Sequence, residues 1–265
     1  MSTPNSAYAR TTAPEPRKIV SSDDVEIATY EFGDSNGPPV VAVHGFASSA
    51  LVNWAATGWT RDLTRAGFRV IALDQRGHGR SDKPLDPNAY SMEQLVLDLL
   101  AVMDTYMLDE VQYIGYSLGA RVGWQTALKL ESRITRAVLG GIPDGQPLTR
   151  VKTDQAFAYL HDGQAIDDPV TLAYVTMAAN VEGNDLSALM ALVDGMRDSM
   201  QPDVHNAPRQ EILFATGSQD AIIERSKRLA AATPHGSFYE IPGRNHFNAP
   251  TSRSFRDTAI EFLRA

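Results

Sequence analysis

Short apolar runs alternate with longer segments of helical period along most of this chain, and this alternation limits the folds open to it. The apolar runs occupy residues 40–43, 69–73, 111–115, 136–140, 211–216 and 237–241. Runs that do not alternate with polar residues are typical of strands with both faces covered. The helical segments span about residues 53–66, 91–106, 118–130, 222–232 and 251–263. Because crossovers between parallel strands are right-handed, this order predicts an α/β fold with a mainly parallel sheet and helices on both faces.

Local signals mark two element boundaries. Residues 25–32 mix β-branched and aromatic residues in near alternation, and a cluster of Gly, Asp, Ser, Asn and Pro follows at 33–39. This pattern predicts an edge strand and a turn. Ser91 followed by Gln94 is typical of a capping box, in which the hydroxyl and the amide satisfy unpaired backbone N–H groups. We therefore expect a helix to begin there.

One stretch interrupts the alternation. Residues 143–208 contain no strand-like run, only helical segments at about 153–160, 170–179 and 186–200. An insert of this length is too long for an ordinary loop, so we expect it to fold as a helical lid over the edge where the strands end. Residues 1–16 are polar with three prolines and are expected to be a flexible tail, which leaves residues 17–265 as a single domain containing the lid.

Composition excludes several kinds of site and partner. The net charge of -8 comes from acidic residues spread along the chain, which argues against nucleic acid or an anionic membrane as a partner. The 265 residues include no cysteine, so disulfides, thiolate catalysis and cysteine metal sites are excluded. No apolar run approaches the roughly 18 residues of a membrane span, and no secretory signal opens the chain. We expect a cytoplasmic protein; the sequence leaves a homodimer open.

The strongest chemical signal is the sequence Gly115-Tyr116-Ser117-Leu118-Gly119, between the strand predicted at 111–115 and the helix predicted from residue 118. This is the G-x-S-x-G nucleophile elbow in its strand-turn-helix setting. A nucleophilic serine must stand clear of the sheet on a sharp turn, and the two glycines keep side chains from colliding there. Ser117 is the predicted nucleophile.

A serine hydroxyl is a weak nucleophile at neutral pH, so it needs a base and a group that orients the base. Asp220 follows the predicted strand 211–216, and His246 follows the strand 237–241 in a loop rich in glycine and proline. A helix-capping role for Asp220 is also compatible with this position. The chain order Ser, Asp, His is the order of this type of hydrolase, which favours a Ser117, Asp220, His246 triad.

The negative charge that forms on serine attack needs two aimed donors. One is expected to be the backbone N–H of Leu118 at the start of the helix, and the other the N–H of Phe46. Phe46 comes directly after His44-Gly45, where the strand 40–43 ends in a sharp turn. We interpret His44 as a buried buttress of this turn.

With these residues in place, the chain resembles the α/β-hydrolase superfamily in its serine-nucleophile, esterase-like branch. The motifs that carry the resemblance are His44-Gly45-Phe46, residues 74–81 (DQRGHGRS), the elbow, and the loops of Asp220 and His246. The resemblance implies that residues 74–81 are a structural turn. Epoxide hydrolases and haloalkane dehalogenases of this superfamily carry aspartate where this chain has Ser117, which disfavours those activities.

The expected function is cleavage of a carboxylic ester, thioester or lactone of a small-molecule acyl substrate through an acyl-Ser117 intermediate, with no metal or organic cofactor. Two alternatives stay open: a carbon-carbon bond hydrolase of a ring-cleavage pathway, and a small-molecule-binding signalling member of the fold with weak catalysis. Aromatic and methionine side chains of the insert could line an acyl pocket, although at helical spacing such residues more often pack the core. They are Phe157, Tyr159, Tyr174, Met177, Met190, Met196 and Met200.

Overall fold

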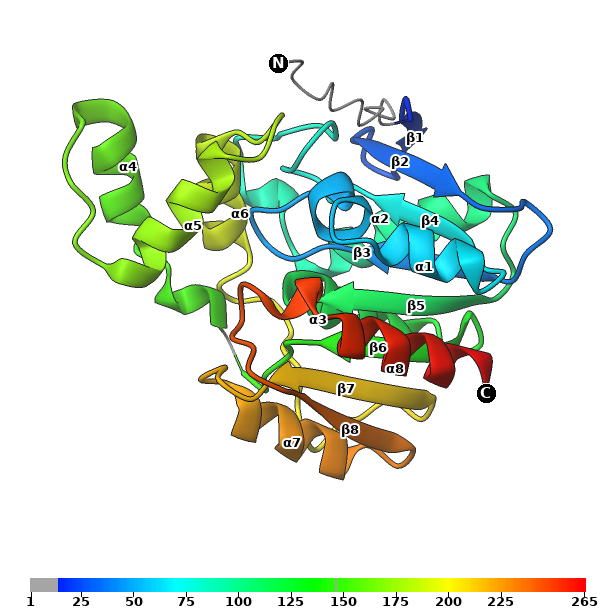
Figure 1. Ribbon diagram of the computed structural model, residues 1–265. Helices are drawn as coiled ribbons and strands as arrows, with labels where there is room; N and C mark the ends of the chain where they lie inside the picture. Colours follow the sequence, from blue (N-terminus) through cyan, green and yellow to red (C-terminus); the bar gives the residue numbers. More distant parts are fainter. Residues whose placement is uncertain (1–13, 146) are drawn as a thin grey trace, which may run out of the picture.

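A computed structural model describes residues 14–145 and 147–265. The tail expected over residues 1–16 therefore lies mostly outside the described residues. The described chain forms an eight-stranded sheet in the order β1-β2-β4-β3-β5-β6-β7-β8 (Figure 1). The strands are β1 (Arg17–Val20), β2 (Glu26–Phe32), β3 (Pro39–Val43), β4 (Arg69–Leu73), β5 (Val111–Tyr116), β6 (Ile134–Gly140), β7 (Glu211–Gly217) and β8 (Gly236–Ile241). β4, β3 and β5 to β8 run parallel, which confirms the predicted α/β class.

The antiparallel end of the sheet differs from the expectation. β2 is not an edge strand, because β1 pairs with it on one side and β4 on the other. In β1 only Ile19 is buried, and Arg17 and Lys18 are exposed. A strand this short and this polar has too weak a hydrophobic pattern to be read from sequence.

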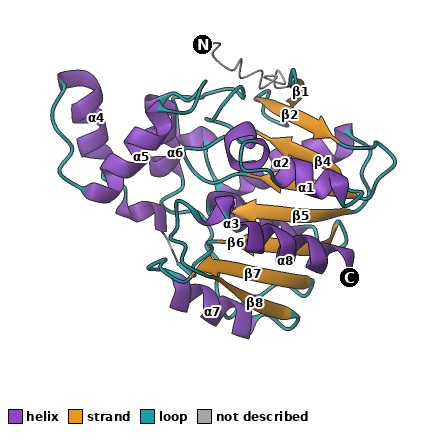
Figure 2. Ribbon diagram, in the orientation of Figure 1, coloured by secondary structure: helices purple, strands orange, loops and turns teal. Residues whose placement is uncertain are grey.

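Helices cover both faces of the sheet, as predicted (Figure 2). The helices α1 (Trp59–Arg65) and α8 (Arg253–Arg264) pack on one face, where Leu63 and Phe255 belong to one buried cluster. The opposite face is covered by α2 (Met92–Thr105), α3 (Leu118–Lys129) and α7 (Ile223–Ala232), which share a second cluster. The parallel strands β3 to β7 are largely buried on both faces and need no polar side, and this explains their continuous apolar runs. The run at 237–241 differs from the expectation of a buried strand, because β8 lies at the edge of the sheet and its Ser237 and Glu240 are exposed.

Two predicted helix starts have different outcomes. The Oγ of Ser91 accepts a hydrogen bond of 3.1 Å from the N–H of Gln94, and α2 begins at the next residue, as the capping pattern predicts. The single helix predicted over residues 53–66 is wrong. A π-helical turn at Leu51–Ala55 ends before Gly58, whose φ of 88° breaks the helix, and α1 starts at Trp59.

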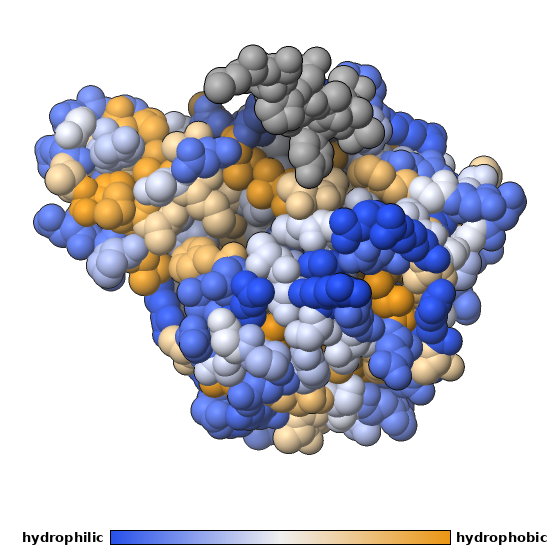
Figure 3. Space-filling view, viewed as in Figure 1, coloured by the Kyte–Doolittle hydropathy of each residue, from blue (hydrophilic) through white to orange (hydrophobic). Residues whose placement is uncertain are grey.

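Three helices lie between β6 and β7, where the sequence predicts a helical insert. They are α4 (Thr153–Asp162), α5 (Pro169–Ala179) and α6 (Leu186–Gly195). The insert projects beyond the carboxyl ends of the parallel strands (Figure 1), and part of its surface is apolar (Figure 3). α6 ends earlier than the predicted residue 200.

The side chain of Asn184 is one of those that join the insert to the body of the molecule. Asn184, just before α6, accepts a hydrogen bond of 2.9 Å from the N–H of Gly79 and donates one of 3.0 Å to the carbonyl of Ala47. Both partners belong to loops that follow parallel strands, so the insert is fixed to the edge of the sheet at this point. Among the described residues, no helix is both long and apolar enough to cross a membrane.

Candidate active site

Ser117 stands on the sharp turn predicted between β5 and α3. It has φ 53° and ψ -110°, a strained conformation for a residue with a side chain. A Cβ on Gly119 would collide with the carbonyl of Val43, and one on Gly115 would lie 2.5 Å from the carbonyl oxygen of Gly119. The two glycines therefore allow β5, α3 and the end of β3 to approach closely enough for this turn to form.

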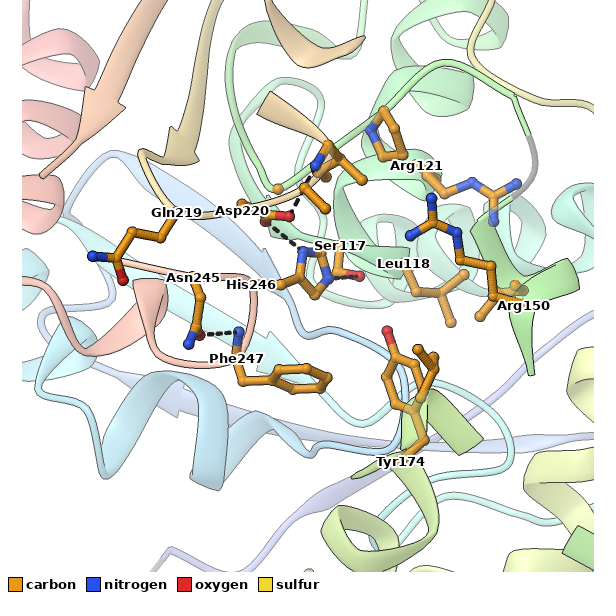
Figure 4. Close-up of a pocket in the computed structure, with 16 residues that line it drawn as sticks. Ser117, Leu118, Arg121, Arg150, Tyr174, Gln219, Asp220, Asn245, His246 and Phe247 are labelled. Carbon is orange, nitrogen blue, oxygen red and sulfur yellow. Dashed lines mark hydrogen bonds and ion pairs between the residues drawn. The ribbon is translucent and has the colours of Figure 1, made fainter. Parts of the chain in front are cut away.

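The structure brings the three predicted triad residues together (Figure 4). The Nε2 of His246 lies 3.0 Å from the Oγ of Ser117, and its Nδ1 lies 2.8 Å from the Oδ2 of Asp220. Asp220 is delivered by the loop after β7 and His246 by the loop after β8. The side chain of Asp220 is almost fully buried, and its other oxygen accepts the N–H of Ile222 at 3.2 Å. The geometry lets a neutral imidazole accept the serine proton while the carboxylate fixes its tautomer.

The two predicted oxyanion donors come from two different segments of the site. Leu118 is the first residue of α3, so its N–H is one of those that lack an acceptor within the helix. The N–H of Phe46 donates to no described residue, and Phe46 lines a cavity together with Ser117. Gly45 lets this segment approach, since a Cβ there would already lie 3.3 Å from the Cβ of Ser117.

Two buried histidines support the segment that carries Phe46. The Nδ1 of His44 lies 2.7 Å from the carbonyl oxygen of Gly45, and its Nε2 accepts the N–H of Gln75 at 3.1 Å. The Nε2 of His78 accepts the N–H of Ala47 at 3.0 Å. Burial lowers the pKa of both imidazoles, which keeps them neutral as acceptors. The interpretation of His44 as a buttress agrees with this geometry.

Residues 74–81 form the structural turn that the resemblance implies. The carboxylate of Asp74 accepts the N–H groups of Ala50 at 2.7 Å and Arg80 at 2.9 Å. The guanidinium of Arg76 is fully buried and bonds the carboxylates of Asp98 and Asp23. These contacts tie the loop after β4 to its neighbours, and none of residues 74–81 lines either of the cavities that contain Ser117.

Two cavities meet at Ser117. We call the first, of about 310 Å³, the arginine cavity, because Arg121 and Arg150 line it. The second cavity, of about 170 Å³, lies toward Phe46 and Met177. The residues common to both are Ser117, Tyr174, His246 and Phe247. The nucleophile thus has space on both sides, as a bond-cleaving site needs for the two parts of its substrate.

The insert contributes fewer lining residues than its aromatic and methionine content suggests. Tyr174 of α5 lines both cavities, and its hydroxyl points toward Leu118 in Figure 4; Met177 lines the second. Tyr159 lines neither cavity and is 48% exposed, whereas Met190 and Met196 are buried among other apolar residues. Phe157 also packs against the core and Met200 is exposed, so the expectation of core packing alone holds for three of the seven residues.

Arg121 and Phe247 line the site but were not singled out from the sequence. Arg121 lies four residues after Ser117 in α3, and residues four apart share one face of a helix. Phe247 directly follows His246. Those two spacings are the signals that could have placed both residues near the nucleophile.

A model of the alpha/beta hydrolase fold matches residues 38–182, more than half of the chain, and spans the elbow. The chain belongs to the alpha/beta hydrolase fold family. This alpha/beta hydrolase is 30% identical over 143 residues to epoxide hydrolase A of Mycobacterium tuberculosis, a match that covers 53% of this chain and 42% of that protein. It is 34% identical over 128 residues to a putative 2-succinyl-6-hydroxy-2,4-cyclohexadiene-1-carboxylate synthase of Bacillus subtilis, which covers 48% of this chain and 44% of the relative. The matches therefore span less than half the length of these relatives.

Among solved structures, this alpha/beta hydrolase is similar to the enol-lactonase from Burkholderia xenovorans LB400, with a TM-score of 0.78 and 22% identity over 94% of this chain and 100% of that one. A hydrolase from Pseudomonas aeruginosa PA01 is similar too, with a TM-score of 0.74 and 22% identity over 94% and 98% of the two chains. At this identity the likeness shows a shared fold.

Proposed function

We propose that this alpha/beta hydrolase cleaves a carboxylic ester, thioester or lactone of a small acyl substrate through an acyl-Ser117 intermediate. The observation that carries the proposal is the continuous chain of hydrogen bonds from Ser117 through His246 to Asp220. The same hydrogen-bonded chain of Ser, His and Asp makes a serine hydroxyl nucleophilic on unrelated folds, although the order of the three residues along the sequence differs among them.

The proposed reaction has two halves. His246 takes the proton from the Oγ of Ser117 as the oxygen attacks the carbonyl carbon, and the N–H groups of Phe46 and Leu118 bind the resulting oxyanion. His246 then gives the proton to the leaving oxygen or sulfur, and the acyl group stays on Ser117. In the second half, His246 takes a proton from water, the hydroxide attacks the acyl-enzyme, and Ser117 recovers its proton. These steps need no metal or organic cofactor.

The insert acts in this proposal as a lid that shapes the acyl site. Val170 and Tyr174 of α5 line the arginine cavity with Ser117, and Met177 of the same helix lines the second cavity. Side chains at these positions limit which groups fit beside the nucleophile.

Epoxide hydrolysis is the main competing activity, because epoxide hydrolases are among the relatives in sequence. The resemblance implies that epoxide hydrolases of this superfamily carry aspartate at the elbow, whereas this chain has Ser117. Carbon-carbon bond hydrolysis uses the same triad and remains the second alternative. Slow turnover by a ligand-binding protein is the third.

Labelling by a fluorophosphonate probe, followed by mass mapping of the labelled peptide, tests the proposal. Wild type should be labelled at Ser117 and should hydrolyse short esters, whereas Ser117→Ala should do neither. Ser254→Ala, which removes an exposed hydroxyl on α8, is the matched control. Wild type that opens styrene oxide but leaves esters and a vinylogous diketone intact would contradict the ester assignment.

A further inference from the structure

Arg121 is a buried cation in the wall of the arginine cavity. It lies one turn beyond Ser117 in α3 and is only 2% exposed. Its Nε and Nη2 find no hydrogen-bond partner among the described residues, and no carboxylate there forms an ion pair with it. Buried charges in proteins are normally paired, because taking a charge out of water is costly.

The contrast with Arg76 shows how this protein treats a structural arginine. Arg76 is equally buried, but it bonds the carboxylates of Asp98 and Asp23 and the carbonyl of Ala89. Arg121 has no such set. Burial lowers the pKa of Arg121 to about 10, and no acidic side chain opposes that shift. The guanidinium therefore remains protonated near neutral pH, with its charge uncompensated by the described chain.

The rest of the cavity suits an anion that also carries an apolar part. Arg150 of the insert adds a second, exposed guanidinium, which lies on the same side as that of Arg121 in Figure 4. The acidic residue that lines this cavity, Asp220, is bonded to His246. Apolar side chains complete the wall; they are Leu118, Pro143, Leu148, Val170 and Ile222.

We infer that the substrate carries a carboxylate, which Arg121 binds in the arginine cavity while the ester, thioester or lactone carbonyl lies against Ser117. The inference rests on the proposed function and narrows its substrate class. A planar guanidinium matches the two oxygens of a carboxylate. Four residues of helix separate Ser117 from Arg121 by a rise of about 6 Å, so a short apolar spacer would join the two ends of the substrate. Arg150 adds a weaker attraction at its exposed position.

Pairs of esters that differ by one carboxylate test whether the enzyme prefers a substrate with a carboxylate. Monomethyl adipate is compared with methyl hexanoate, and 4-carboxyphenyl acetate with phenyl acetate, so that the carboxylate is placed in turn on the acyl and on the leaving group. In wild type, kcat/KM for the charged member of at least one pair should exceed that of its neutral partner about tenfold or more. Arg121→Gln should lower this ratio at least about 30-fold, as expected for loss of a desolvated charge pair. Arg150→Gln should lower it less than about fivefold.

Arg253→Gln is the matched control, since Arg253 is an exposed arginine of α8 paired with Asp257. In Arg253→Gln the ratio of kcat/KM for the charged over the neutral ester should equal that of wild type. Thermal unfolding checks that Arg121→Gln folds, and Arg121→Met should raise Tm by roughly 2–4 °C, because it replaces an uncompensated buried charge by an apolar side chain. A fall in Tm for both Arg121 variants would mean that the described chain already compensates this charge, which would count against the inference.

A binding measurement separates failure of the inference from failure of the proposed function. Adipate should raise the Tm of wild type and of Ser117→Ala but not that of Arg121→Gln. If wild type hydrolyses esters with the same ratio as a folded Arg121→Gln, the carboxylate inference is overturned and the proposed function stands. If no ester is hydrolysed yet adipate stabilises the protein in an Arg121-dependent way, the anion site stands and the ester chemistry fails.

Discussion

The hydroxyl of Tyr116 donates a hydrogen bond of 2.6 Å to the backbone carbonyl of His246. The residue before the proposed nucleophile thereby holds the loop that carries the proposed base, and its ring lies 5.5 Å from the imidazole. Strand β5 thus positions both partners of the Ser117–His246 hydrogen bond, although they are far apart in sequence.

Removing the hydroxyl of Tyr116 should make the position of the His246 loop less well defined. Tyr116→Phe keeps the ring but leaves the carbonyl of His246 without this donor, at a cost of about 1 kcal/mol. We expect kcat for a short ester to fall about 3- to 10-fold, with a smaller change in KM. Tyr239→Phe, which removes a half-buried hydroxyl from β8, serves as the control in the same steady-state assay. Unchanged kcat in Tyr116→Phe would show that other contacts hold the loop.

The triad members should contribute unequally. Ser117→Ala and His246→Ala should each lower kcat by about 10^4-fold, and Asp220→Asn by less, because the imidazole remains. Asp144→Asn is the control acid: it lies in the loop after β6 but pairs with Arg225 at 2.6 Å. Ester turnover and thermal unfolding should be measured for all four. If Asp144→Asn lost more activity than Asp220→Asn, the assignment of the orienting acid would have to change.

Chain-length preference should depend on α5. Tyr174→Ala and Met177→Ala enlarge the cavities beside Ser117, so the ratio of kcat/KM for hexanoate over acetate esters should rise about tenfold. Tyr159→Ala removes an exposed aromatic ring of α4 that lines neither cavity and should leave the ratio unchanged. A lower Tm with an unchanged ratio in the two α5 variants would identify these side chains as packing residues.

The free energy of unfolding should depend on pH through the carboxylate of Asp62 in α1, which bonds Arg61 of the same helix and Arg256 of α8. A hydrogen bond from Arg61, with a second from Arg256 of α8, holds the pKa of Asp62 down to about 2, against the opposing effect of partial burial. A lowered carboxyl pKa contributes stability above the usual value of 3.8, and this contribution is lost as the pH falls toward 2. Asp62→Asn should therefore lower the free energy of unfolding by about 1 kcal/mol at pH 7, a value discounted for solvent screening.

Urea unfolding at pH 7, 4 and 3 would measure this difference, which should shrink at the lowest pH. Asp257→Asn breaks an exposed pair with Arg253 and is the control, with little effect expected at any pH. A deficit of Asp62→Asn that stays constant from pH 7 to 3 would mean that charge is not its cause.

Local sequence signals predicted most of the sheet and the positions that meet at the site. Ser117 and Asp220 each follow a strongly apolar strand, His246 follows the more polar β8, and the ends of parallel strands share one edge of a sheet. The elbow adds glycines two residues before and two residues after Ser117, a spacing explained by the close approach of β5, α3 and the end of β3. Such signals survive in a single sequence because each depends on neighbouring residues.

The misses have a different origin. β1 exists because it pairs with β2, and its one buried residue, Ile19, gives no periodic pattern. The break at Gly58, whose φ is 88°, separates Trp54 from Trp59, and the two rings pack edge to face with centroids 5.6 Å apart, a contact that helical periodicity does not predict. Arg121 matters because it is buried without a partner, and both conditions are set by tertiary contacts. Sequence patterns indicate local geometry, but they do not indicate whether a buried side chain lacks a hydrogen-bond or ion-pair partner.

The two hydrogen bonds of Asn184 couple the insert to the proposed reaction centre. This side chain binds the N–H of Gly79 and the carbonyl of Ala47, next to the proposed donor Phe46. Tyr174 of α5 adds a second contact, since its ring packs edge to face against that of Phe46. Substitutions in the insert that disturb either contact should therefore act on the proposed oxyanion donor as well as on the shape of the cavities, so remodelling these helices for a new substrate should also change the reaction rate.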